Sequence, residues 1–324
     1  MVQAVVWVSR VLTKGGGVGM KIFYIANFND VYSKKWADYF DDNGHSVTCY
    51  HLKKPKIKDL KMVKAKIKEV KPDILHSQYA GRWALLGMLT GFHPHIVTIH
   101  GSEVLLTKGI KRNRVEWILR KADLITTDGY NVIEKIKGWG INPYKIRMVN
   151  FGFDTDHFRP MPELRTETPR LVVRYGTGVP VYDLSTFGMA YRSDIFTHCS
   201  VRTLKDYSQE EAPAIFNKGW VYVSTALSDS GLAGTTHEAM ACGLPVVITN
   251  VADNSLWVDK EYLFEPGDYM KLREIVMRLL ENPKEREHQG KKNRETIVSR
   301  NNYQVEMAKM QKIYVEALSW QKKK

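Results

Sequence analysis

One segment, residues 224–250, constrains the fold of this chain more than any other. It follows a short apolar run at 220–224, passes through a loop of small residues that includes Gly231, and leads into a helical pattern that Gly243 ends. A second apolar run, 245–249, comes directly after. The order strand, loop, helix, strand predicts a unit of a parallel α/β sheet, whose loop lies at the carboxyl ends of the strands, where ligands bind.

The loop of this segment has the chemistry of an anion site. Its peptide N–H groups open onto a helix N-terminus, where the helix dipole favours negative charge, and residues such as Ser228 and Thr235 offer hydroxyls. Glu238 lies about one turn into the helix, where a carboxylate can accept two hydrogen bonds from a vicinal diol such as a ribose. An ordinary strand–helix unit with small residues for tight packing also fits the spacing. Spacing alone therefore does not distinguish a binding site from a structural unit, and the residue types are needed.

These residue types resemble a known motif. The run EAMACGLPVV, which begins at Glu238, is similar to the sugar-nucleotide motif of glycosyltransferase family 4, whose members have the GT-B fold. The resemblance implies that Glu238 binds the ribose hydroxyls of a nucleotide sugar, and that the N–H groups of Gly231 and Leu232 bind sugar or phosphate oxygens. The family has another glutamate where Ser230 stands here, and Asp229 is the neighbouring carboxylate.

Two further positions match the family outside this segment. His100 ends an apolar run and is followed by a glycine; by itself such a histidine is either structural or functional. The family has a His-Gly turn at this place, which implies that His100 is a catalytic residue in contact with the donor sugar. Arg174 ends the run RLVVR and resembles the arginine that binds the donor phosphates, although the lysine that usually follows it is absent.

The architecture predicted from these observations is α/β and of the GT-B type, with two Rossmann-like doubly wound domains that face a cleft. We expect an acceptor-side domain over 20–158, a nucleotide-sugar-binding domain over 159–302, and a C-terminal helix over 303–324 that crosses back to the first domain. Strand and helix patterns alternate throughout. The stretch 186–220 is shorter than in the family, so the second domain is predicted to lack about one βα unit.

The charge of the chain is concentrated in one segment. The net charge is +13, and residues 51–72 hold nine lysines against two carboxylates. Ile57, Val63 and Ile67 recur there at helical spacing, which predicts a basic amphipathic helix. Its lysines form either the solvated outer face of a packed helix or a contact with an anionic membrane. No RNA-binding motif accompanies the charge, so we expect no nucleic-acid partner.

Composition and spacing argue against several other classes of protein. The three cysteines have no C-x-x-C spacing, which indicates neither a disulfide framework nor a zinc site. No apolar run reaches the roughly 20 residues of a membrane span. No cluster of histidines and carboxylates has metal-ligand spacing. We therefore expect a cytoplasmic protein, peripheral at the inner face of the membrane if the basic helix binds it, with no metal and no cofactor.

The predicted function is that of a retaining glycosyltransferase. It would move a sugar from a nucleoside-diphosphate sugar to an acceptor hydroxyl on a glycan or a lipid-linked molecule. The alternative is a catalytically impaired or inactive paralogue that binds sugar nucleotides. Ser230, the missing lysine and the short stretch 186–220 favour the alternative.

Residues 1–19 are predicted to be a leader that is not part of the native protein, because translation is expected to start at Met20 and not at Met1. Their apolar part is interrupted at Arg10, unlike a signal peptide, and Gly15–Gly17 just before Met20 can be encoded by a ribosome-binding sequence. Mass spectrometry of the native protein should therefore find a chain that begins at Met20. A mature chain that begins at Met1 would contradict this expectation.

Overall fold

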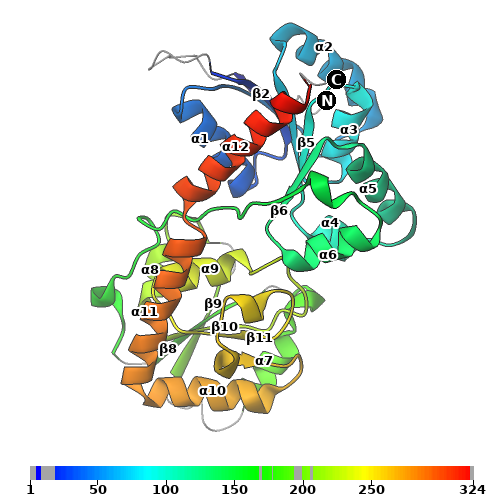
Figure 1. Ribbon diagram of the computed structural model, residues 1–324. Coiled ribbons are helices and arrows are strands. Elements are labelled where there is room, and N and C mark those ends of the chain that lie inside the picture. The colour runs from blue at the N-terminus through cyan, green and yellow to red at the C-terminus, as the bar shows by residue number, and fades with distance from the viewer. Residues whose placement is uncertain are drawn as a thin grey trace. The chain divides into compact units, whose positions relative to one another are not determined.

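The structure is a computed structural model that describes residues 5–8, 19–167, 170–176, 178–192, 199–204 and 207–321. The chain divides into two compact units (Figure 1). Unit 1 holds the residues up to Phe151 together with those from Glu306 onward, and unit 2 holds Gly152–Val305. Each unit is an α/β layer structure built on its own sheet, as the sequence predicts.

The sheet of unit 1 has seven strands in the order β1-β3-β2-β4-β5-β6-β7. Its strands are β1 Val5–Val8, β2 Lys21–Ala26, β3 Ser46–His51, β4 Ile74–Gln78, β5 His95–Thr98, β6 Leu124–Thr127 and β7 Ile146–Met148. Strands β2 to β7 pair in parallel. Strand β1 pairs antiparallel with β3, Val5 opposite His51. The sequence analysis did not predict β1, because it interpreted residues 1–19 as a leader.

Helices connect these strands. They are α1 Val31–Asp42, α2 Leu60–Val70, α3 Arg82–Thr90, α4 Ser102–Leu105, α5 Gly109–Lys121, α6 Tyr130–Gly138 and, at the end of the chain, α12 Tyr303–Gln321. Strands β2 and β4 are almost entirely buried, as continuous apolar strands covered by helices on both faces should be. A basic helix forms as predicted, and Val63 and Ile67 lie on its buried face. The prediction was wrong for Ile57, which falls in a separate 3-10 turn, η1 Ile57–Asp59, and is 59% exposed.

The sheet of unit 2 has five parallel strands in the order β12-β11-β10-β8-β9. The strands are β8 Arg170–Tyr175, β9 Cys199–Leu204, β10 Val221–Ser224, β11 Val246–Thr249 and β12 Leu263–Phe264. The helices are α7 Leu184–Tyr191, α8 Ala212–Lys218, α9 Gly234–Ala241, α10 Tyr269–Glu281 and α11 Pro283–Arg300. Among the described residues this sheet has two strands fewer than that of unit 1. That the second domain lacks about one βα unit of the family stays a prediction. A strand expected at 194–198 lies outside the described residues.

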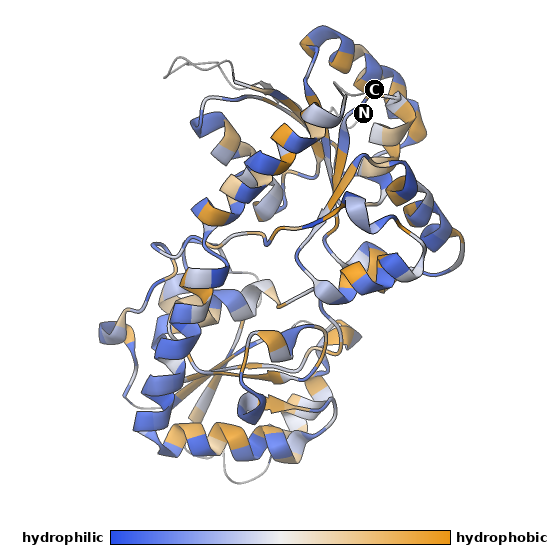
Figure 2. Cartoon of the chain, in the orientation of Figure 1, coloured by the Kyte–Doolittle hydropathy of each residue, from blue (hydrophilic) through white to orange (hydrophobic). Residues whose placement is uncertain are grey.

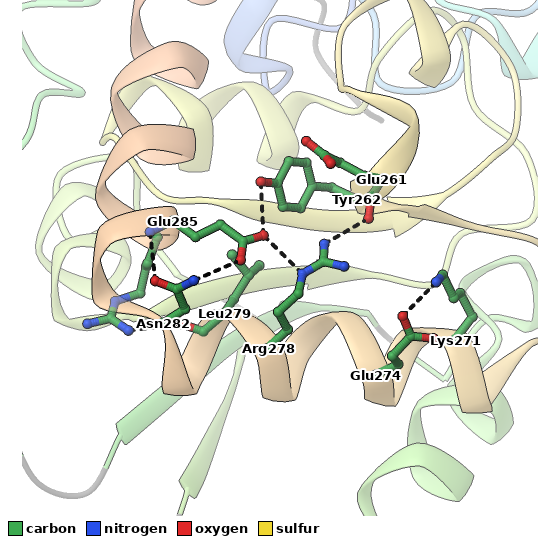
Figure 3. A network of polar contacts seen from close by, with 9 residues as sticks. Glu261, Tyr262, Lys271, Glu274, Arg278, Leu279, Asn282 and Glu285 are labelled. Atoms are coloured by element: carbon green, nitrogen blue, oxygen red, sulfur yellow. Dashed lines mark hydrogen bonds and ion pairs between the residues drawn. The ribbon is translucent and has the colours of Figure 1, made fainter.

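Polar contacts hold the last two helices of unit 2 to its sheet (Figure 3). Asn282 caps α11 by accepting a hydrogen bond from the N–H of Glu285. The carboxylate of Glu285 accepts from Nε of Arg278 at 2.9 Å and from Oη of Tyr262 at 3.1 Å. Arg278 also donates to the carbonyl of Glu261. One guanidinium therefore joins α10, α11 and the segment that enters β12.

The boundary between the units lies within the irregular segment 150–160. Nε1 of Trp36 donates to the carbonyl of Phe151, which attaches this residue to unit 1. The N–H of Gly152 donates to Oδ1 of Asn301, and the N–H of Phe153 donates to the carbonyl of the same asparagine, so both belong to unit 2. The change of unit at 151/152 precedes the change expected at 158/159, because backbone contacts to Asn301 begin at Gly152.

A buried chain of hydrogen bonds attaches α12 to the sheet of unit 1. The hydroxyl of Tyr314 lies 2.5 Å from that of Tyr24 and 2.6 Å from Nδ1 of His76. Nε2 of His76 lies 2.7 Å from Oγ1 of Thr98, and this oxygen lies 2.6 Å from Oγ1 of Thr126. Burial lowers the pKa of His76 well below its usual value, so its ring is neutral and donates through one nitrogen while it accepts through the other.

Replacing Tyr314 by phenylalanine should destabilise unit 1. The substitution keeps the ring but leaves Tyr24 and His76 without their shared buried partner, a loss of about 1 to 3 kcal/mol. Urea denaturation measures the effect, and Tyr144→Phe, at a side chain that is 83% exposed, is the matched control. Equal free energies of unfolding for the Tyr314 variant and the wild type would show that the chain of hydrogen bonds carries no stability.

Candidate functional site

The segment predicted from sequence as a site forms the loop 225–233 between β10 and α9. Asp229, Ser230, Gly231 and Leu232 all lie in this loop. Gly231 has φ +59°, a left-handed conformation that favours glycine. Ser230 and Leu232 are 9% and 3% exposed. The loop is thus largely buried at the carboxyl end of β10, where it leads into α9.

Arg174 lies at the carboxyl end of β8, the strand next to β10. Its side chain is 7% exposed, and its guanidinium stacks over the ring of Phe187 at 4.5 Å. The hydrogen bond it donates to the carbonyl of Tyr175 is long, 3.4 Å. In the part of the chain that the structure describes, no carboxylate lies within ion-pair distance of it.

A buried charge without a counter-ion is costly, and an arginine in that state is a ready partner for an anion. Burial lowers the pKa of Arg174, yet a guanidinium keeps its charge in proteins. The guanidinium packs closely against Gly176, where an added Cβ would lie 2.4 Å from Nη2 of Arg174. The described residues do not neutralise this guanidinium.

Glu238 lies in α9 and is 3% exposed. Its two oxygens accept hydrogen bonds from different side chains: Oε2 from Oη of Tyr207 at 3.0 Å, and Oε1 from Nε2 of Gln209 at 2.8 Å. The sequence analysis missed both partners. They lie in the connection between β9 and α8, where no periodicity or motif pointed to Glu238. Together they fix the orientation of the carboxylate.

Electrostatic effects link the predicted residues of unit 2. Burial raises the pKa of the Tyr222 hydroxyl, and the negative charges of Glu238 and Asp229 raise it further. The same tyrosine acts on the pKa of Arg174. Burial also raises the pKa of Asp229 to about 7, although the N–H of Ser230 donates to its Oδ1 at 3.2 Å. Arg174 lies near the end of β8, Asp229 lies in the loop after β10, and Glu238 lies in the helix that follows this loop.

His100 belongs to unit 1, where it follows β5. Its Nε2 lies 2.9 Å from Oε1 of Gln78, and its N–H donates to Oε1 of Glu103, which also accepts from the N–H of Ala80. Glycine at 101, with φ +108°, allows the chain to turn there. Oε2 of Glu103 and Nε2 of Gln78 are buried, and neither has a partner among the described atoms. Two polar groups with spare hydrogen-bonding capacity thus accompany His100.

Family models match most of both units. The model described as Glycosyltransferase Family 4 matches residues 31–157, and the model described as Glycosyl transferases group 1 matches residues 189–282. CapJ of Staphylococcus aureus is 33% identical over 91 residues, a segment that spans 28% of this chain and only 23% of CapJ. The sequence similarity to that protein is therefore local.

Solved structures share the fold over nearly the whole chain. Sucrose-phosphate synthase from Thermosynechococcus elongatus superposes with a TM-score of 0.78 at 16% identity, covering 92% of this chain and 99% of that one. HepE of Anabaena, solved in complex with UDP-glucose, gives a TM-score of 0.73 at 13% identity, covering 93% and 99%. Identities this low show a common fold.

The two units and these superpositions show the GT-B fold. Both matching family models describe glycosyltransferases, so the class of the protein is a glycosyltransferase of the GT-B fold. Together the two family matches cover more than half of the sequence. The chain belongs to glycosyltransferase family 4, as its sequence motifs predict.

The raised pKa of Asp229 predicts a dependence of stability on pH. Between about pH 4, where a carboxyl group titrates in the unfolded chain, and about 7, where Asp229 titrates in the fold, the native state binds more protons than the unfolded state. The free energy of unfolding should therefore fall as the pH rises through this window, and Asp229→Asn should remove that fall.

Urea denaturation from pH 5 to 8 measures this effect. Glu295→Gln changes an exposed carboxylate of the same unit and serves as the control. If Asp229→Asn and the control show the same pH dependence as the wild type, Asp229 has an ordinary pKa in the fold.

Proposed function

We propose that the protein transfers a sugar from a nucleoside-diphosphate sugar to an acceptor hydroxyl, and that it retains the configuration at the transferred carbon. One observation carries this proposal: a buried, uncompensated Arg174 and a buried, oriented Glu238 share the carboxyl edge of one sheet. In this arrangement the cation suits the diphosphate of a nucleotide, and the carboxylate, as a hydrogen-bond acceptor, suits the two hydroxyls of its ribose. Retention is proposed on the resemblance to family 4.

Each residue has a role in this proposal. Glu238 accepts hydrogen bonds from the ribose hydroxyls, because a carboxylate offers about four lone-pair sites to donors. Arg174 forms hydrogen bonds with the diphosphate, and the N–H groups of Gly231 and Leu232 donate to sugar or phosphate oxygens.

The main chemical task is to stabilise the negative charge on the departing diphosphate, and a fixed cation with aligned N–H groups does this. The scheme requires neither a metal nor a cofactor.

Asp229 and His100 complete the proposed site. Because the pKa of Asp229 lies near 7, this carboxyl is partly neutral at physiological pH and opposes an anion less than an ordinary aspartate would. His100 is the proposed catalytic residue that contacts the donor sugar. Its ring is oriented by Gln78, and Glu103 holds its backbone.

The second candidate function is a sugar-nucleotide-binding paralogue without transferase activity. Ser230 stands where the family has a carboxylate, and no lysine follows Arg174 within the stretch 175–185. Both changes remove groups that would act on the sugar or on the leaving diphosphate. In this function the nucleotide would still bind through Arg174 and Glu238.

The acceptor and the location are proposed on broader grounds. The acceptor is a glycan or a lipid-linked hydroxyl, and the protein works in the cytoplasm, in peripheral contact with the membrane. The lysine-rich segment 51–72 supports the contact with a membrane, since each lysine near an anionic surface contributes about 1 kcal/mol. In the described ranges, no helix is long and apolar enough to cross a membrane.

Calorimetry with UDP, GDP and ADP tests the donor site, followed by hydrolysis and transfer assays with the sugar nucleotide of whichever base binds. The wild type should bind one of them and prefer it to the 2′-deoxy form. Glu238→Ala should weaken that binding by roughly 1 to 3 kcal/mol and remove the preference, because the ribose hydroxyls lose their acceptor.

The outcomes separate the two functions. Binding with turnover establishes the transferase, and binding without transfer or slow hydrolysis establishes the inactive paralogue. If none of the three nucleotides binds, both functions are wrong. If Glu238→Ala keeps the preference for the ribose form, the role given to Glu238 is wrong even when the nucleotide binds.

A further inference from the structure

Unit 1 has a hollow that the donor site does not involve, which we name the basic hollow. It is lined by three cationic side chains and by apolar ones: Lys56, Arg82, Arg114, Ile57, Leu85 and Leu86. These residues come from the segment that enters η1, from α3 and from α5. Figure 1 shows α2, α3 and α5 next to one another at this side of unit 1. The hollow has a volume of about 380 Å³, which lies in the range of small-molecule sites.

The charges of the basic hollow are not compensated. Its described lining contains no carboxylate, and none of its three cations forms an ion pair with another described residue. Nε of Arg114 is buried and donates to no described atom. A buried N–H without an acceptor is rare in folded proteins and indicates a missing partner. Three cations and an orphaned N–H donor fit a phosphate group.

The surroundings of the basic hollow are apolar as well as basic. Leu86 is 1% exposed and forms part of the hollow's wall, whereas Ile57 is 59% exposed where it lines the hollow. Ile110 is 87% exposed and lies one turn before Arg114 in α5, on the same face of the helix. Figure 2 shows apolar and polar residues interspersed along α2 and α5.

This pattern distinguishes a lipid from a soluble anion. Solvent-exposed isoleucines beside the site would contribute nothing to the binding of free phosphate. Burying such a side chain in an apolar phase contributes about 1.5 to 3 kcal/mol, and a bilayer surface also offers the anionic groups that lysines and arginines bind. Lys108, Lys111 and Arg112 flank Ile110 in sequence. The combination of exposed aliphatic residues with surrounding cations is that of a membrane-docking surface.

We propose that the basic hollow binds the phosphate head group of an anionic lipid, with Ile57 and Ile110 inserted at the membrane surface. Arg82, Arg114 and Lys56 neutralise the phosphate. This inference makes the proposed membrane contact specific, since it assigns recognition to the hollow and leaves only general attraction to the lysines of α2. It does not depend on nucleotide binding in unit 2.

Co-sedimentation with vesicles of phosphatidylcholine, with and without phosphatidic acid, tests the proposal. The wild type should bind only the vesicles that contain phosphatidic acid. The double variant Arg82→Gln/Arg114→Gln removes two charges worth about 1 kcal/mol each near the membrane, so binding should weaken about thirtyfold. The control Lys284→Gln/Lys291→Gln removes the same charge from exposed positions of unit 2 and should bind as the wild type does.

Ile110→Ser is a second variant that leaves the charge unchanged. At a position 87% exposed it should not alter the melting temperature, yet it should weaken vesicle binding several-fold, because the inserted side chain is lost. If the wild type binds neither kind of vesicle, or if the unit 2 control loses binding as the hollow variant does, the proposal is wrong. Displacement from vesicles by inorganic phosphate would instead identify a site for a soluble anion and overturn the assignment to lipid.

Discussion

Parallel strand pairing is the constraint on which both units depend. Two neighbouring parallel strands require a crossover connection, usually a helix. This connection returns the chain to the end of the sheet at which every strand begins. The carboxyl ends of all the strands then meet at the opposite edge. In unit 2 this brings Arg174 at the end of β8 beside the loop 225–233 after β10, although some 50 residues separate them in sequence. The candidate site follows from this topology, with no special fold element of its own.

The sequence predicted what depends on local pattern. The unit β10–loop–α9–β11 was predictable because two apolar strands, a glycine stop and the EAMACG run all lie within one short segment. The positions of Arg174 and His100 at strand ends followed from the same patterns. Tyr207 and Gln209 could not be predicted as partners of Glu238, because a side-chain pair between distant segments has no periodicity. Strand β1 was missed since its pairing with β3 depends on the tertiary fold.

Buried polar groups have two different roles in this molecule. Between α12 and the sheet of unit 1, Tyr314 and His76 are fully supplied with partners, which fixes one arrangement of the helix on the sheet. Arg174, Arg114 and Glu103 instead keep atoms or charges that no described residue satisfies. Native proteins keep few such groups. Arg174 and Arg114 lie in the two candidate binding regions, and Glu103 lies beside the proposed catalytic histidine. Other buried atoms without a partner among the described residues, such as Nε2 of His45 and Nε of Arg286, lie outside these regions.

Helix α12 also has a consequence for how the protein is made. Tyr24 and Tyr314, which share a hydrogen bond in unit 1, are 290 residues apart in sequence. Closing so long a loop costs entropy before any contact forms, and contacts of this kind slow folding. A ribosome that has completed unit 2 has not yet made the helix that covers Tyr24 and His76. Unit 1 therefore cannot complete its fold until α12 has been made, after all of unit 2.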